Sequence, residues 1–121
     1  MQISLHSSVG KQRKSNQDYA DYFKSDFNQY LFVLCDGVGG HQAGEVASEL
    51  TTKYLGKQFK QLTKELTKED ASQWIGKAIE DVNTYLYEES LKDRQLAGMG
   101  TTLVVSLITK EFVLIAHVGD S

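Results

Sequence analysis

The sequence predicts an α+β fold, because strand-like and helix-like segments occur in blocks instead of alternating along the chain. A pair of strand-like segments comes first, two amphipathic helical segments follow, and a second pair of strand-like segments comes last. Strict strand–helix–strand alternation, which is typical of a doubly wound parallel sheet, is missing. We therefore expect antiparallel strands in a layered αββα arrangement.

The first block is predicted to be a short strand followed by an antiparallel hairpin. Residues 2–6 have strand character, and residues 10–18 show no period and are predicted to be a loop. Residues 19–25 alternate apolar and polar side chains, as a half-exposed strand does. After turn residues at 26–29, the nearly continuous apolar run 30–35 predicts a central strand.

Two helices are predicted in the middle of the chain, each from apolar residues at helical spacing. The first is marked by Ala43, Val46, Ala47, Leu50 and Tyr54. The second begins near Thr67, which resembles a capping box together with Asp70. Its apolar stripe consists of Ile75, Ala78, Ile79, Val82 and Leu86. The polar stretch 56–69 is interpreted as a connection or a solvated helix end.

The last block is predicted to be a second hairpin. Glycines at 98 and 100 interrupt the helical pattern, and residues 101–109 and 112–118 are rich in β-branched and apolar side chains. Only Lys110 and Glu111 separate them, which predicts a very short turn. Because a core strand is followed at once by the last residue, we expect the chain to be a piece of a longer domain.

Composition limits the class of protein. A chain of 121 residues fits one domain or part of one, and 40% hydrophobic with 24% charged residues is ordinary globular composition. The net charge of −3 excludes a strongly basic nucleic-acid binder. No stretch has the apolar length of a membrane span, and the first residues lack a secretory signal pattern. The single cysteine, Cys35, is interpreted as a core residue in a reducing compartment, so we expect a cytoplasmic protein without membrane insertion.

Acidic residues lie beside glycine or in loops near the ends of three strand-like runs, at Asp18, Asp36 and Asp120. Hard cations such as Mg²⁺ and Mn²⁺ prefer oxygen ligands, so a few carboxylates and a carbonyl are sufficient to hold them. Asp36, at the end of the central strand, is the best-placed candidate, and glycine at Gly37 would let its carbonyl turn inward without a side-chain clash. Taken singly, each aspartate is better interpreted as an ordinary turn residue.

Two further residues have chemistry suited to phosphate. The guanidinium of Arg13 can grip a phosphate through two parallel hydrogen bonds, although between Lys11 and Lys14 it also fits solvated surface. His41 fits a general acid, a metal ligand or a surface residue on a polar turn. No spacing matches a zinc site, and the glycine run is not a phosphate-binding P-loop because no Gly-Lys-Ser/Thr follows.

Four stretches resemble, in order, the sequence blocks of the metal-dependent protein serine/threonine phosphatases of the PPM family, type 2C, in particular the bacterial members. They are GKQRKSNQD (10–18), DGVGGHQAGEVAS (36–48), GTT (100–102) and AHVGDS (116–121). One block would be weakly specific, whereas four in order are highly specific. The resemblance covers 1–121 and corresponds to the N-terminal portion, about the first half, of a single phosphatase domain. It implies a four-layer αββα sandwich, with two central antiparallel β-sheets flanked by helices, of which this chain holds a part.

The resemblance also implies roles for matching residues. Asp36 resembles the carboxylate that bridges two catalytic Mn²⁺ or Mg²⁺ ions, and Gly37 the residue that lends its carbonyl. Asp18 resembles an acidic residue that reaches a metal partly through water. Arg13 resembles the residue that holds the substrate phosphate, and Asp120 a ligand of a third, weaker metal.

The sequence departs from the family pattern at two positions. Gln17 stands where glutamate is frequent, which removes a charge near one metal. Val38 stands where animal members place a histidine general acid, so His41 or water must serve instead. The implied reaction is attack on phosphoserine or phosphothreonine by a hydroxide bridging the two metals. The implied partners are phosphorylated proteins, including a cognate Ser/Thr kinase, for a protein that acts as a monomer.

Two other functions are open at this point. A pseudophosphatase would keep the fold and bind partners without catalysis, and a small-molecule phosphomonoesterase would use the same metals on other phosphoesters. Retention of Arg13, Asp18, Asp36, Gly37 and Asp120 favours an enzyme over a pseudophosphatase. The 121-residue piece by itself is expected to have little activity, because it lacks the later metal-binding aspartates of the family.

Overall fold

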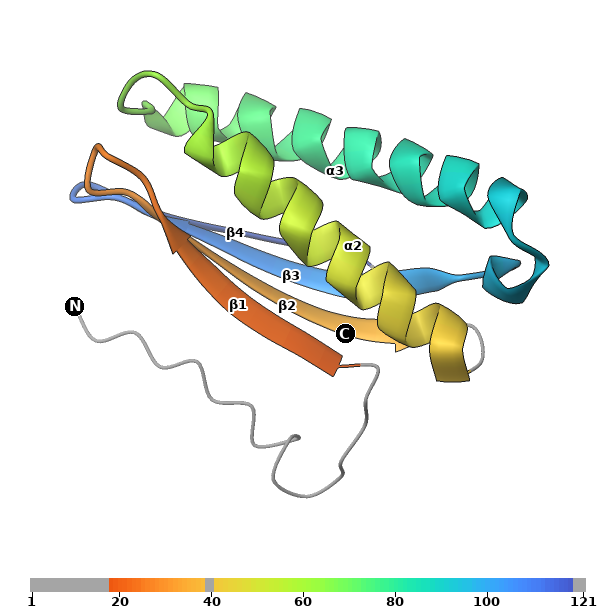
Figure 1. Ribbon diagram of the computed structural model, residues 1–121. Helices are drawn as coiled ribbons and strands as arrows, with labels where there is room; N and C mark the ends of the chain where they lie inside the picture. Colours follow the sequence, from red (N-terminus) through yellow and green to blue (C-terminus); the bar gives the residue numbers. More distant parts are fainter. Residues whose placement is uncertain (1–17, 39–40, 119–121) are drawn as a thin grey trace.

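The computed structural model describes residues 18–38 and 41–118, and for Asp18 and His41 it describes the backbone alone. Within these ranges the chain forms one four-stranded antiparallel sheet, in the order β1-β2-β3-β4, with two long helices on one of its faces (Figure 1). This confirms the α+β prediction. The strand predicted at 2–6 falls in the part of the chain that the structure does not describe.

The first hairpin is formed as predicted, by β1 (Asp18–Lys24) and β2 (Tyr30–Val38). Its turn is closed by a hydrogen bond from the amide of Ser25 to the carbonyl oxygen of Gln29, at 2.9 Å. Asn28 has a positive φ of 62°, a conformation that asparagine tolerates well. However, β2 extends three residues beyond the predicted run of 30–35, through the Asp-Gly pair.

The two predicted helices are α2 (His41–Lys60) and α3 (Lys68–Lys92). The Thr67 hydroxyl caps α3 by accepting a hydrogen bond from the amide of Asp70, at 3.1 Å, as its sequence predicts. Residues 56–69 include the predicted helix end and connection, since α2 continues to Lys60, but the stretch is not solvated throughout, because Phe59 and Leu66 are buried. Phe59 explains this extension, because its ring is fully buried and packs edge-on against Trp74 of α3.

The second hairpin is also formed as predicted, by β3 (Gly100–Ile108) and β4 (Val113–Val118). Its turn is as short as predicted, since the amide of Thr109 donates to the carbonyl oxygen of Phe112 at 2.9 Å and only Lys110 and Glu111 lie between these two residues. Between α3 and β3 the chain makes one 3₁₀ turn, η1 (Arg94–Leu96). Gly98 then takes a φ of +75°, which only glycine adopts easily.

The core lies between the sheet and the helices. Helix α2 packs over β1 and β2, and α3 lies beside it toward β4 (Figure 1). Side chains of alternate strand residues point to this layer, because successive residues of a strand face opposite sides of the sheet. The buried cluster combines these residues with the apolar stripes of the helices, and it includes Leu31, Val33, Cys35, Leu55, Phe59, Ile75, Val82, Leu103, Val105 and Leu107.

The opposite face of the sheet is apolar but is not covered by any of the residues that the structure describes. Tyr22 and Ile115 are 56% and 62% exposed there, and Phe32 stacks on the Tyr22 ring with centroids 5.6 Å apart. Such a face fits one half of a sandwich, since a second layer would bury it. No helix in the described ranges is long and apolar enough to cross a membrane.

Candidate metal centre

Asp36 lies within a strand, near the end of β2, and not in a turn. It pairs on one side with Asp18 of β1 and on the other with Thr102 of β3. The interpretation of Asp36 as an ordinary turn aspartate is therefore wrong. Hydrogen bonding to two neighbouring strands continues the strand past its apolar run, and this fixes the backbone that carries the carboxylate.

The side chain of Asp36 is exposed and belongs to the face of the sheet that faces away from the helices. Its carboxylate has no hydrogen-bond or ion-pair partner within residues 18–38 and 41–118. The backbone carbonyl of Asp36 accepts a long hydrogen bond, 3.5 Å, from the hydroxyl of Thr102. No side chain in the described part of the chain therefore bonds to this carboxylate, and the backbone beneath it is held by β3.

The register of the first hairpin places two acidic positions side by side. Asp18 is the residue directly opposite Asp36 across β1 and β2. Like charges at opposed positions destabilise an antiparallel pair unless they are compensated. A divalent cation at this edge would provide that compensation with the oxygen ligands that Mn²⁺ and Mg²⁺ prefer. The donor set at this position therefore fits a hard metal ion.

Position 37 requires glycine because any side chain there would collide with α2, and the sequence alone does not show this contact. Gly37 is buried, and a Cβ atom built on it would lie 1.9 Å from the carbonyl oxygen of Gly44 and 2.7 Å from Ser48 Oγ. The position that a side chain would take at residue 37 is thus occupied by the N-terminal part of α2. Direct packing of helix backbone on strand backbone sets the position of the residue next to Asp36.

Behind Asp36, the side chain of Cys35 points into the core, as predicted. It is 1% exposed, and its Sγ lies 3.5 Å from Thr52 Oγ1 of α2. Burial raises the pKa of the Cys35 thiol, and hydrogen bonds to Thr52 and Thr101 oppose this effect only in part. The thiol is therefore protonated at neutral pH and is no nucleophile.

Only part of the predicted site lies in the described ranges. The structure brings Asp18, Asp36 and Gly37 together, and it places His41 at the first residue of α2, one turn before Gly44. Arg13, Gln17 and Asp120 belong to the ranges without a described structure, so their roles stay predictions. Residues 18–38 and 41–118 contain no group of three or more His, Cys, Asp or Glu side chains able to hold a metal.

Three contributors to the site were not identified from the sequence: Thr102, Gly44 and Ser48. Thr102 belongs to the GTT block, but nothing in its local sequence indicates that it pairs with Asp36. Gly44 and Ser48 are about one helical turn apart, so they lie on the same face of a helix, and the small size of both residues is the signal for close packing. Their partner across the interface, Gly37, becomes visible only in three dimensions.

Comparison with known proteins shows that this chain matches one protein family. The profile described as "Protein phosphatase 2C" matches residues 7–121. The serine/threonine phosphatase stp of Listeria welshimeri is 42% identical over 123 residues, which cover 100% of this chain and 48% of that protein. Protein phosphatase PhpP of Streptococcus pneumoniae strain D39 is 36% identical over 121 residues, again 48% of its length. The chain thus spans about half the length of these relatives.

Solved structures show the same likeness in three dimensions. The serine/threonine phosphatase Stp1 from Staphylococcus aureus superimposes with a TM-score of 0.81 at 40% identity, covering 92% of this chain and 43% of that one. The Mycobacterium tuberculosis phosphatase PstP/Ppp gives a TM-score of 0.70 at 30% identity, covering 89% of this chain and 42% of the other. In both cases nearly all of this chain corresponds to less than half of the neighbour.

Proposed function

Because this chain belongs to the protein phosphatase 2C family, we propose that the protein that contains it is a metal-dependent hydrolase of phosphoserine and phosphothreonine in other proteins. The observation that carries the proposal is the opposition of Asp18 and Asp36 at the edge of a rigid sheet. Relatives at 36–42% identity are named serine/threonine phosphatase or protein phosphatase, which supports the substrate class.

In this proposal the Asp36 carboxylate, shared between two Mn²⁺ or Mg²⁺ ions, would hold the metal together with the Gly37 carbonyl and Asp18, which form the part of the metal site that this chain would provide. Asp120 contributes to a third, weaker site. When bound, such ions would supply the nucleophile, because a divalent metal lowers the pKa of a coordinated water molecule so that it ionises near neutral pH. The further ligands would come from the part of the domain that this chain does not cover, since it spans 48% of the Listeria welshimeri protein.

The remaining residues act on the phosphoryl group. Arg13 binds the phosphate oxygens and neutralises charge that develops on them during displacement. His41, at the start of α2, protonates the leaving serine or threonine oxygen, a role that water would otherwise fill. No covalent phosphoenzyme is formed through Cys35, whose thiol is buried and protonated. The proposed substrates are cytoplasmic phosphoproteins, including a cognate Ser/Thr kinase, and the protein acts as a monomer.

The decisive experiment compares two aspartates of the same hairpin in the natural full-length protein. Asp36→Asn removes the proposed bridging carboxylate with minimal change in volume. Asp26→Asn makes the same chemical change at the exposed turn, at the other end of the hairpin. The assay measures release of phosphate from a phosphothreonine peptide in the presence of Mn²⁺. The rate should fall by about 10³-fold or more for Asp36→Asn, which is the size of effect expected when a central electrostatic group of an active site is lost. The rate of Asp26→Asn should stay within about twofold of the wild type.

Two of the results that would contradict the proposal also identify an alternative function. No hydrolysis of any phosphoester by a folded full-length protein would indicate a pseudophosphatase that binds partners. Faster turnover of sugar phosphates than of phosphopeptides would indicate a small-molecule phosphomonoesterase. Activity that survives Asp36→Asn or removal of metal by EDTA would exclude the metal mechanism itself.

A further inference from the structure

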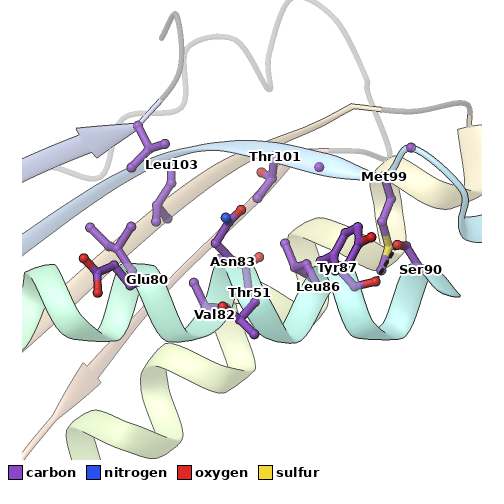
Figure 2. Close-up of a pocket in the computed structure, with 15 residues that line it drawn as sticks. Thr51, Glu80, Val82, Asn83, Leu86, Tyr87, Ser90, Met99, Thr101 and Leu103 are labelled. Atoms are coloured by element: carbon purple, nitrogen blue, oxygen red, sulfur yellow. Dashed lines mark hydrogen bonds between the residues drawn. The ribbon is translucent and has the colours of Figure 1, made fainter. Parts of the chain in front are cut away.

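His117 of β4 lies on the same face of the sheet as Asp36. The next residue, Val118, lines the hollow between β3 and α3 together with Leu103, whose side chain points toward α3 in Figure 2. Because successive residues of a strand face opposite sides of a sheet, His117 faces away from the helices, and its side chain is exposed there. Asp36 faces the same way. His117 and the proposed metal centre therefore share one surface of the sheet.

The register of the strands places His117 beside the row that contains Asp36. His117 pairs with Val104 of β3, and Val104 pairs with Leu34 of β2. Asp36 and its partner Thr102 form the next row on this face, two residues further along their strands. Neighbouring strands lie about 4.8 Å apart and rise about 3.4 Å per residue, so the Cα atoms of Asp36 and His117 are roughly 12 Å apart. This is too far for a direct hydrogen bond between the two side chains, but it places His117 in the surroundings of a site built on Asp36.

The imidazole of His117 has no hydrogen-bond or ion-pair partner among the residues that the structure describes. The rest of its row is apolar, and the hydroxyls of Thr102 and Ser106, at the two diagonal positions of β3, do not bond to it. Such an apolar face is typical of a surface that a further layer covers, and a covered imidazole needs an acceptor for its N–H. Carboxylates of the metal centre are acceptors on this side of the molecule, and the chain itself reaches Asp120 three residues after His117.

We propose that His117 is a positioning residue of the metal centre, whose imidazole N–H donates a hydrogen bond to a carboxylate that binds metal. This inference rests on the proposed function. Hard cations prefer oxygen ligands to nitrogen, so a histidine here fits a group that orients a ligand better than it fits a ligand itself. A hydrogen bond to a ligating carboxylate fixes its orientation, and loss of such a partner typically lowers metal affinity or activity by about 10- to 100-fold.

The test measures Mn²⁺ binding to the natural full-length protein by isothermal titration calorimetry, so the readout does not depend on phosphatase activity. His117→Phe keeps an aromatic ring and removes the N–H donor, and it should raise the Kd for Mn²⁺ by about 10- to 100-fold. His117→Asn and His117→Gln place an amide N–H near the positions of Nδ1 and Nε2, respectively. The amide that replaces the donor should restore the Kd to within about threefold of the wild type, and the other should resemble His117→Phe. If His117 only filled space, His117→Phe would instead be the mildest of the three changes.

Ser106→Ala is the matched control. It removes a polar group from the same face of the sheet, on the side of His117 that is further from Asp36, and it should leave the Kd for Mn²⁺ within about twofold of the wild type. An unchanged Kd for His117→Phe, an equal effect of Ser106→Ala, or failure of both amides to restore binding would each overturn the proposal. If His117→Phe does not fold, equal affinities of the two amide variants would overturn it.

Asp36→Asn separates this inference from the function on which it rests. Weaker Mn²⁺ binding by Asp36→Asn, together with an unchanged Kd for His117→Phe, would overturn the role of His117 alone. A wild-type protein that binds no Mn²⁺, or an Asp36→Asn variant that binds it as the wild type does, would overturn the metal centre and the role of His117 together.

Discussion

Replacing Gly37 with alanine perturbs the contact between α2 and the strand that carries Asp36. The added Cβ would lie 1.9 Å from the carbonyl oxygen of Gly44, 2.4 Å from its carbonyl carbon and 2.7 Å from Ser48 Oγ. To restore the 3.4 Å of ordinary contact, the oxygen would have to retreat by about 1.5 Å. Two of the three obstructing atoms are helix backbone, so a side-chain rotation does not relieve the clash.

The expected cost follows from this geometry. Overpacking that a core relieves by small shifts costs about 1–3 kcal/mol, and an obstructing backbone puts Gly37→Ala at the upper end, near 3 kcal/mol. That is a large fraction of the roughly 5–15 kcal/mol by which native domains are stable. Because Asp36 is the next residue, a strand displacement of about 1 Å should also lower phosphatase activity of the folded variant by about 100-fold.

The assay is urea denaturation of the full-length protein, with Gly76→Ala as the matched control. A Cβ at Gly76, on the exposed side of α3, meets nothing within 4 Å. That substitution should raise the free energy of unfolding by about 0.5–1 kcal/mol, the helix preference of alanine over glycine. A change of less than about 0.5 kcal/mol for Gly37→Ala would refute the reasoning, because it is the size of an ordinary surface substitution.

Three further predictions concern stability. Gln29→Met should lower the free energy of unfolding by about 1–3 kcal/mol in urea denaturation, because it leaves the buried Leu66 amide, now 2.7 Å from Gln29 Oε1, without an acceptor; an unchanged midpoint would contradict this. Gly56→Ala should cost about 1–3 kcal/mol, since its Cβ would meet the Phe23 ring at 2.3 Å, and Phe23→Leu should recover part of this in a double-mutant cycle. Because burial raises the pKa of Cys35, the folded state holds the thiol proton more tightly, so this residue's contribution to stability is complete below pH 9.0 and is lost as the pH rises above it. The difference in unfolding free energy between wild type and Cys35→Ala should then shrink by up to about 1.4 kcal/mol per pH unit, and a constant difference would exclude the effect.

Local sequence pattern determined the secondary structure of this protein to a large extent. The alternation in β1, the apolar run in β2 and the apolar stripe from Ile75 to Leu86 are each read from neighbouring residues, and the structure has those elements. The Thr67 cap was also predictable, because a cap and its amide partner lie only three residues apart. Asp36 could be singled out for the same reason, from the strand before it and the glycines after it.

Tertiary structure decided the features that depend on residues far apart in the chain. Asp-Gly at 36–37 is typical turn chemistry, yet pairing with Asp18 and Thr102 keeps both residues in a strand. The last residues of α2 are polar, yet burial of Phe59 against Trp74 keeps them helical. In each case the preference of a residue for a local conformation is worth a few tenths of a kcal/mol up to about 1 kcal/mol. Strand pairing and burial of apolar side chains contribute more free energy than this.

The same division applies to the site. The sequence by itself identified Asp18 and Asp36 as carboxylates suited to a hard cation, because composition and order are enough to recognise donor chemistry. Only the folded sheet decided that they lie directly opposite each other, and that Gly37 must lack a side chain to accommodate Gly44 of α2. A register and a backbone contact are distances between segments separated along the chain, and no local pattern of side chains specifies such distances.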